Sequence, residues 1–168
     1  MGEENRDGGH SARDPDLHHV NNSYRWSTDG QNPDGKAFTV FLPHLNGDPR
    51  LHTGATASEA LGDPAADPTV CLAQHCDWRL PAIGELRTIL IGPDAAPGQA
   101  TTCSSAPCID PDFAAVAGPT DSWWYWSVST VAGNQGNAWY ADFSLGLVDQ
   151  RFKEQGMHAR AVRTGSCD

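Results

Sequence analysis

The sequence has no long apolar run. No stretch of its 168 residues approaches the roughly 20 consecutive apolar residues that a membrane-spanning helix needs, so we expect no membrane insertion. The first residues, Met-Gly-Glu-Glu-Asn, also lack the basic and apolar parts of a signal peptide. Localisation must therefore be argued from other residues.

Basic residues are also scarce. The chain has 11 Lys and Arg against 21 Asp and Glu, which gives a net charge of −10. Such a charge repels polyanions, so nucleic acid, heparin-like chains and anionic membrane surfaces are not expected as partners. Neutral ligands, cations and basic partners remain. The alternative is that the charge only keeps an exported domain soluble.

Motifs for catalysis and metal binding are missing as well. The sequence contains no recognisable Ser/His/Asp set and no phosphate-binding glycine loop. Residues 29–35, DGQNPDG, offer many oxygen ligands, but Val40 stands where an EF-hand has its closing Glu. Histidines and aspartates within residues 1–19 are not held in a preorganised site. We therefore expect no enzyme activity, no cofactor and no metal.

Four of the five cysteines form two pairs with the same spacing, Cys71 with Cys76 and Cys103 with Cys108. Each spacing can close a small disulfide loop. Reduced structural cysteines or a metal site are the alternatives, although zinc ribbons use a two-residue gap and His75 alone does not complete a ligand set. Disulfides would place the domain outside the cytoplasm, as a secreted, periplasmic or cell-surface protein.

Composition and patterning predict one loop-rich domain. The chain has 39% hydrophobic residues together with 17 Gly and 12 Pro, which allows a core but implies many turns. Residues 1–19 are predicted to be a flexible polar arm or a truncated first strand, and residues 20–168 a single domain. Within that domain, residues 47–70 are rich in Gly, Pro, Asp and Ala and are predicted to form a surface insertion.

Two segments have the apolar spacing of a helix. The first covers residues 38–45, and Pro43 should kink or shorten it. The second begins at Pro81 and ends before Gly92, with a buried face made by Ile83, Leu86, Ile89 and Leu90.

The C-terminal third is β-prone instead. A short strand near Tyr24 and an antiparallel meander over residues 122–130, 137–146, 147–152 and 158–163 are predicted. Two helices before such a sheet indicate the α+β class. In the second strand of the meander, alternation assigns Trp139, Ala141, Phe143 and Leu145 to the core and Tyr140, Asp142 and Ser144 to the outer face.

A set of motifs then resembles the Lcl C-terminal domain family over roughly residues 20–165. The motifs are YRWS, DGKAFTVFLPHLNG, CDWRLPAIGELRTI, CIDPDF, YWSVST, AWYADFSLG and HARAVR, in this order. The resemblance implies a C-type-lectin-like fold, with two helices packed on a small twisted antiparallel sheet, long loops and local disulfides. Formylglycine-generating enzymes and the displayed proteins of diversity-generating retroelements share this kind of fold. The resemblance therefore implies that the domain presents a binding surface and does not catalyse a reaction.

The resemblance also gives several residues structural roles. A Cys71–Cys76 disulfide would fix the start of the second helix. Arg79 and Glu85 should form a structural ion pair, and Arg160 and Arg163 should tie the last strand to the rest. Core positions are expected for Trp78, Trp126 and Trp139.

The function implied is that of an extracytoplasmic ligand-binding or adhesion module for a glycan or protein partner. Its surface should consist of polar or aromatic residues that point away from the core, with an ordinary solvated face as the alternative for each. The candidates are Trp124, Asn134, Gln135, Asn137, Tyr140, Asp142, Asp149, Arg151, Lys153 and His158.

Other functions remain open. A structural or assembly domain, which could be a homo-oligomer, is the main alternative, and a formylglycine-generating-type oxidase is a weaker one. A retroelement-diversified receptor is a variant of the binding hypothesis, with its variable positions in residues 122–158. Calcium-bridged sugar binding is not expected, because the signature motifs of calcium-dependent lectins are absent.

Overall fold

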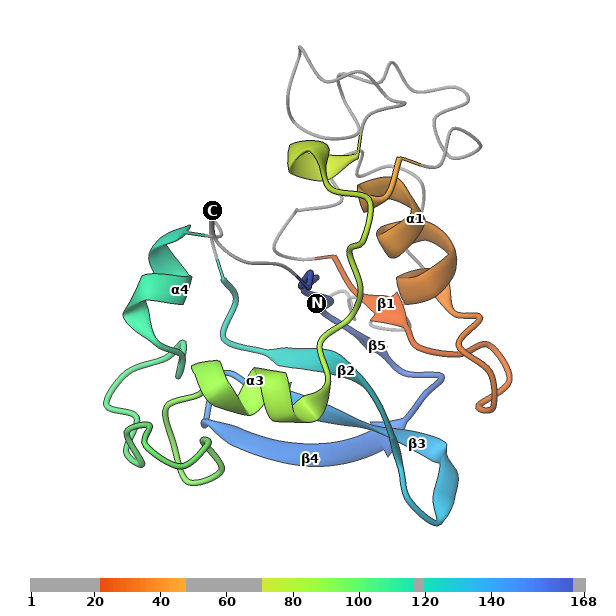
Figure 1. The fold of residues 1–168 in the computed structure, drawn as a ribbon. Coiled ribbons are helices and arrows are strands. Elements are labelled where there is room, and N and C mark those ends of the chain that lie inside the picture. Colours follow the sequence, from red (N-terminus) through yellow and green to blue (C-terminus); the bar gives the residue numbers. More distant parts are fainter. Residues whose placement is uncertain (1–21, 48–70, 117–119, 165–168) are drawn as a thin grey trace, which may run out of the picture.

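The computed structural model describes residues 22–47, 71–116 and 120–164, and it shows a small α+β domain with two antiparallel sheets (Figure 1). The predicted arm and nearly all of the predicted insertion lie outside the described residues. The larger sheet has the order β2-β3-β4, with β2 at Trp124–Val131, β3 at Asn134–Asp142 and β4 at Leu147–Phe152. The smaller sheet pairs β1 (Tyr24–Arg25) with β5 (Gly156–Met157).

The helical segments are short. They are η1 (Ala37–Phe41), α1 (Leu42–Leu45), η3 (Leu72–Gln74), α3 (Ile83–Ile89) and α4 (Pro111–Val116). Among the described residues, no helix has both the length and the apolar character needed to cross a membrane.

The first predicted helix changes type at Pro43. Residues Ala37–Phe41 form a π-helix, and the α-helical turn begins at Leu42 with Pro43 in its first turn. Proline has no N–H to donate to the preceding turn, so the hydrogen-bond pattern must change where it enters the helix. Backbone angles stay helical across this change, at Phe41 (φ −59°, ψ −59°) and Leu42 (φ −64°, ψ −44°). The structure therefore shows a change of helix type and not the predicted kink or shortening.

The second predicted helix starts two residues later than expected, at Ile83. Ala82 is extended (φ −67°, ψ 157°) and donates its N–H to Glu85 Oε2 at 2.7 Å. Both Glu85 oxygens also accept hydrogen bonds from the Arg79 guanidinium, each at 2.7 Å. The predicted ion pair is thus confirmed, and it fixes the residue at which the helix begins.

A test of this ion pair follows from the pKa of Glu85. The hydrogen bonds from Arg79 lower it from 4.5 to about 2, so ionised Glu85 stabilises the folded state above about pH 4.5. That contribution is lost as the pH falls towards 2. We expect Glu85→Gln to lower the free energy of unfolding modestly at pH 7, because the pair is partly exposed. Urea denaturation at pH 7 and pH 3 should show the variant and parent converging at the lower pH, whereas a constant difference would contradict this assignment.

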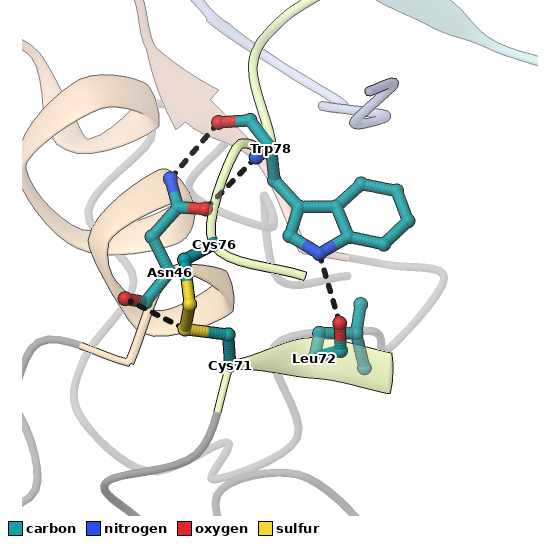
Figure 2. The surroundings of a disulfide bond; sticks show 5 residues. All are labelled: Asn46, Cys71, Leu72, Cys76 and Trp78. Carbon is teal, nitrogen blue, oxygen red and sulfur yellow. Dashed lines mark hydrogen bonds between the residues drawn. A yellow bond between two sulfur atoms is a disulfide. The ribbon is translucent and has the colours of Figure 1, made fainter. Parts of the chain in front are cut away.

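The predicted disulfide between Cys71 and Cys76 is present, with the Cα atoms 5.1 Å apart, and it lies against the end of α1 (Figure 2). Asn46 connects the two segments. Its Nδ2 donates to the carbonyl of Trp78 at 2.9 Å, and its Oδ1 accepts the Trp78 N–H at 2.8 Å. The indole N–H of Trp78 in turn donates to the carbonyl of Leu72 at 3.1 Å. The disulfide loop is therefore docked on α1 just before the chain reaches α3.

The second predicted disulfide, Cys103–Cys108, is also present. The N–H of Cys108 donates to the carbonyl of Phe143 at 2.6 Å, and its Sγ lies 3.2 Å from the carbonyl of Ser144. This second loop is thus tied to the end of β3.

Hydrophobic residues are buried on both faces of the larger sheet. Trp126 of β2 is fully buried in a first cluster with Tyr24, Phe41, Leu45, Leu80 and Met157. Its neighbour Tyr125 points the other way, into a second cluster with Leu86, Ile89, Ala141 and Phe143. The core assignment of Trp126 and Phe143 is therefore confirmed, and Trp78 packs partly buried against the first cluster.

The expected alternation over residues 139–145 is wrong at four positions. Tyr140 is 5% exposed and belongs to the first cluster, and Asp142 is 8% exposed. Trp139, in contrast, is only half-buried, and Leu145 is 57% exposed. The pattern assumed a sheet with one buried face. Because this sheet is covered on both faces, alternation alone does not identify the buried side.

The predicted last strand, residues 158–163, is not a strand. It makes isolated bridges instead, between Val162 and Arg79 and between His158 and Tyr125. Arg160 holds this segment as expected, through hydrogen bonds to the Thr120 hydroxyl (3.2 Å) and the Phe113 carbonyl (3.1 Å).

A pair of substitutions tests the corrected packing of β3. Tyr140→Ala empties a core position and should lower the free energy of unfolding by about 3 kcal/mol. Leu145→Ala, at an exposed position, should change it by less than about 1 kcal/mol. Chemical denaturation of both variants measures the difference. A destabilisation by Leu145→Ala as large as that by Tyr140→Ala would contradict the packing.

Candidate ligand-binding surface

Strand β4 presents its side chains alternately on two faces of the larger sheet. Asp149 and Arg151 lie beside Tyr140 and Ala138 of β3 on one face, and Gln150 and Phe152 lie beside Trp139 and Asn137 on the other. We name the first the arginine face, with residues Trp124, Tyr140, Asp142, Asp149 and Arg151. We name the second the amide face, with residues Asn137, Trp139, Gln150 and Phe152. Sequence reasoning had treated the candidates of both faces as one surface.

The aromatic rings of the arginine face are engaged within the domain. The guanidinium of Arg151 lies 5.0 Å from the centre of the Trp124 ring, and Trp123 stacks on Trp124 at 5.3 Å. Tyr140 packs against the same indole at 5.3 Å. The indole N–H of Trp124 donates to Asp142 Oδ2 at 3.1 Å. Only Asp149 and Arg151 are strongly exposed on this face.

Asp142 and Tyr140 do not point away from the core, contrary to expectation. Asp142 is 8% exposed, and its Oδ1 accepts hydrogen bonds from the N–H and the hydroxyl of Ser144. This carboxylate therefore closes the turn between β3 and β4. Burial raises the pKa of Tyr140, and the nearby carboxylate of Asp149 raises it further. The phenol is accordingly neutral at physiological pH.

Lys153 and His158 are also buried rather than outward-facing. Lys153 is 1% exposed, and its Nζ lies 4.0 Å from the centre of the Trp26 ring and 3.2 Å from the Gln31 carbonyl. His158 is 8% exposed, and its ring packs 5.2 Å from that of Tyr125. Lys153 thus joins the end of β4 to the N-terminal segment, and His158 packs the segment after β5 against β2. Sequence reasoning placed them outside because charged residues are rarely buried.

The amide face is more open. Phe152 is 62% exposed, Gln150 is exposed, and Trp139 and Asn137 are half-buried. Asn137 Nδ2 donates to Gln150 Oε1 at 3.3 Å across the strands. Gln150 and Phe152 were not among the predicted site residues. The period of two along residues 147–152 could have identified them, because it places both on the side of Asn137.

The first residues of β3, at its hairpin with β2, are exposed as well. The predicted candidates Asn134 and Gln135 lie here. In Figure 1 this hairpin extends away from α3, which covers the same sheet further back. The helix therefore leaves the hairpin end of the sheet accessible.

The outer edge of β4 is protected by side chains. The N–H of Val148 donates to Asp94 Oδ2 at 3.0 Å, and the N–H of Gln150 donates to Asp149 Oδ1 at 2.7 Å. Asp94 belongs to the loop after α3, which approaches β4 closely at Gly146: a Cβ there would lie 2.0 Å from the Ile91 carbonyl. Strand addition at this edge would have to displace these bonds.

The loop DGQNPDG is held by its own hydrogen bonds. Asp29 Oδ1 accepts the N–H groups of Gln31 (2.8 Å) and Asn32 (3.2 Å). Asp34 accepts the N–H and the hydroxyl of Thr28 at 2.7 and 2.6 Å. These bonds lower the pKa of both carboxyls. Within the part of the chain that the structure describes, no group of three His, Cys, Asp or Glu residues could hold a metal ion.

Sheet pairing, helix order and the two loop disulfides define this protein as a small disulfide-linked α+β domain. Residues 17–163 match the Lcl C-terminal domain, so the chain belongs to that family. Comparisons with curated proteins and with solved structures gave no match.

Lys153 and Arg151 offer a direct test of which cations are structural. Lys153→Ala removes a buried cation from the Trp26 ring and should lower the free energy of unfolding by about 2 kcal/mol. Arg151→Ala removes an exposed side chain and should cost less than about 1 kcal/mol. Thermal and urea unfolding compare the two variants. Equal stability losses would show that Arg151, too, is part of the scaffold.

Proposed function

We propose that this domain is an extracytoplasmic ligand-binding or adhesion module with a C-type-lectin-like fold, and that its partner is a glycan or a protein. Two local disulfides support a secreted, periplasmic or cell-surface location, because such bonds persist in oxidising compartments. The net charge of −10 favours ligands that are not polyanions.

The observation that carries this proposal is the accessible end of the larger sheet. There an aromatic ring that is 62% exposed lies beside amide side chains. Its strand pairs with β3, whose residues Ala138, Tyr140 and Ala141 are buried in the two clusters. Exposed aromatic residues with adjacent hydrogen-bonding groups are typical of recognition surfaces. A sheet-borne surface is also more rigid than one built on loops.

Two alternatives predict different properties. An assembly domain would need a self-association surface, and the protected N–H groups of β4 argue against edge-to-edge pairing there. A formylglycine-generating-type oxidase would need a free thiolate, whereas Cys71, Cys76, Cys103 and Cys108 are all disulfide-bonded. A receptor diversified by a retroelement would be a variant of the binding proposal. Its variable positions would lie in residues 122–158, which include both faces of the larger sheet.

The proposal is tested by binding to glycan and protein arrays. The double variant Arg151→Ala/Phe152→Ala removes one exposed side chain from each face of β4 and should lose about tenfold or more in affinity for whatever the parent binds. Phe113→Ala is the matched control, because Phe113 is also an exposed aromatic, at 50%, but belongs to α4. It should leave binding unchanged.

Light scattering on the same preparations measures the oligomeric state and so tests the alternative of an assembly domain. A monomeric parent that binds a ligand supports the module, whereas an obligate oligomer without ligand on either array would support the assembly domain. Unchanged binding by the double variant would show that the larger sheet is not the ligand surface.

A further inference from the structure

The amide face carries no formal charge, and neither do the first residues of β3. This uncharged surface consists of Asn137, Trp139, Gln150 and Phe152, with Asn134 and Gln135 at the hairpin end of the same strand. It belongs to a chain with a net charge of −10. The charged residues next to it on β4, Asp149 and Arg151, lie on the opposite face of the sheet. The ligand that best matches the surface is therefore polar but neutral.

Aromatic and amide side chains alternate across this surface. Phe152 lies opposite Asn137, and Gln150 lies opposite Trp139. Side chains directly opposite in an antiparallel pair are roughly 5 Å apart, so the four residues cover an area close to that of one or two sugar rings. The exposed ring of Phe152 offers an apolar platform, and the exposed amide of Gln150 on the same face offers directional hydrogen bonds.

Hydrogen bonding between the amides leaves capacity for a ligand. Asn137 donates to Gln150 Oε1, which orients the Gln150 amide. Among the described residues, no acceptor is found for Nε2 of the exposed Gln150, whereas Asn137 Oδ1 is buried and cannot be reached by a ligand on the surface. An amide offers both a donor and an acceptor, as a sugar hydroxyl does, so the two groups can exchange paired hydrogen bonds.

From these observations we infer that the amide face is a binding site for a neutral saccharide. The inference rests on the proposed binding function and specifies its ligand class and its face. The ring of Phe152 packs against the apolar C–H face of a pyranose, and the amide of Gln150, oriented by Asn137, hydrogen-bonds to its hydroxyls. A carboxylated or sulfated sugar finds no opposite charge on this face.

The test uses the full chain with both disulfides intact. Its probes are cello-, xylo-, manno-, galacto- and chito-oligosaccharides on an array, with heparin and alginate fragments as anionic comparisons. We expect the parent to bind at least one neutral probe and neither anionic one. Phe152→Ala and Gln150→Ala should each weaken that binding about tenfold or more, while Phe152→Tyr, which keeps the ring, should retain it.

Asp149→Ala and Arg151→Ala are the matched controls, because they alter the same strand on its opposite face. Both should change the affinity by less than about twofold, with all variants melting within about 3 °C of the parent. Loss of binding by the controls but not by the amide-face variants would move the site to the arginine face and overturn the inference. Binding only to anionic sugars or only to a protein would overturn the ligand class while leaving the binding module intact. Absence of any ligand on glycan and protein arrays would overturn both proposals.

Discussion

Burial of the larger sheet on both faces is the constraint on which the rest of this structure depends. Tyr125 stacks on Phe143 at 4.3 Å on the α3 side, while the next residue, Trp126, donates its indole N–H to the Tyr24 carbonyl at 2.9 Å on the other side. Two consecutive residues thus anchor two clusters. Since the middle of the sheet is covered by these clusters, the accessible side chains are confined to its edge and its hairpin end.

Short helices make local cross-links necessary. The seven residues of α3 would be a marginal helix in isolation, because nucleation is costly and few hydrogen bonds follow it. The Arg79–Glu85 pair fixes its first turn, and the Cys71–Cys76 loop with Asn46 fixes the approach to it. These contacts limit the conformations of the chain where no long helix does so.

The sequence supplied the features that depend on local spacing. Cysteine spacing predicted both disulfides, and the 3.6-residue period predicted α3. Features that depend on contacts between distant parts of the chain could not be predicted from the sequence. Whether Trp139 or Tyr140 is buried depends on which segments cover each face, and the burial of Lys153 depends on its packing against Trp26, more than 100 positions away.

That burial of Lys153 also bears on the surface next to it. Its N–H donates to the Gly136 carbonyl at 3.0 Å, and its own carbonyl accepts the N–H groups of Trp26 and Ser27, each at 3.0 Å. The end of β4 is therefore held on both sides, immediately after the exposed Phe152. A ligand that packs on this ring would meet a backbone that is already ordered, so little conformational entropy would be lost on binding. The same anchoring explains why substitutions of Phe152 and Gln150 should affect recognition with little effect on the fold.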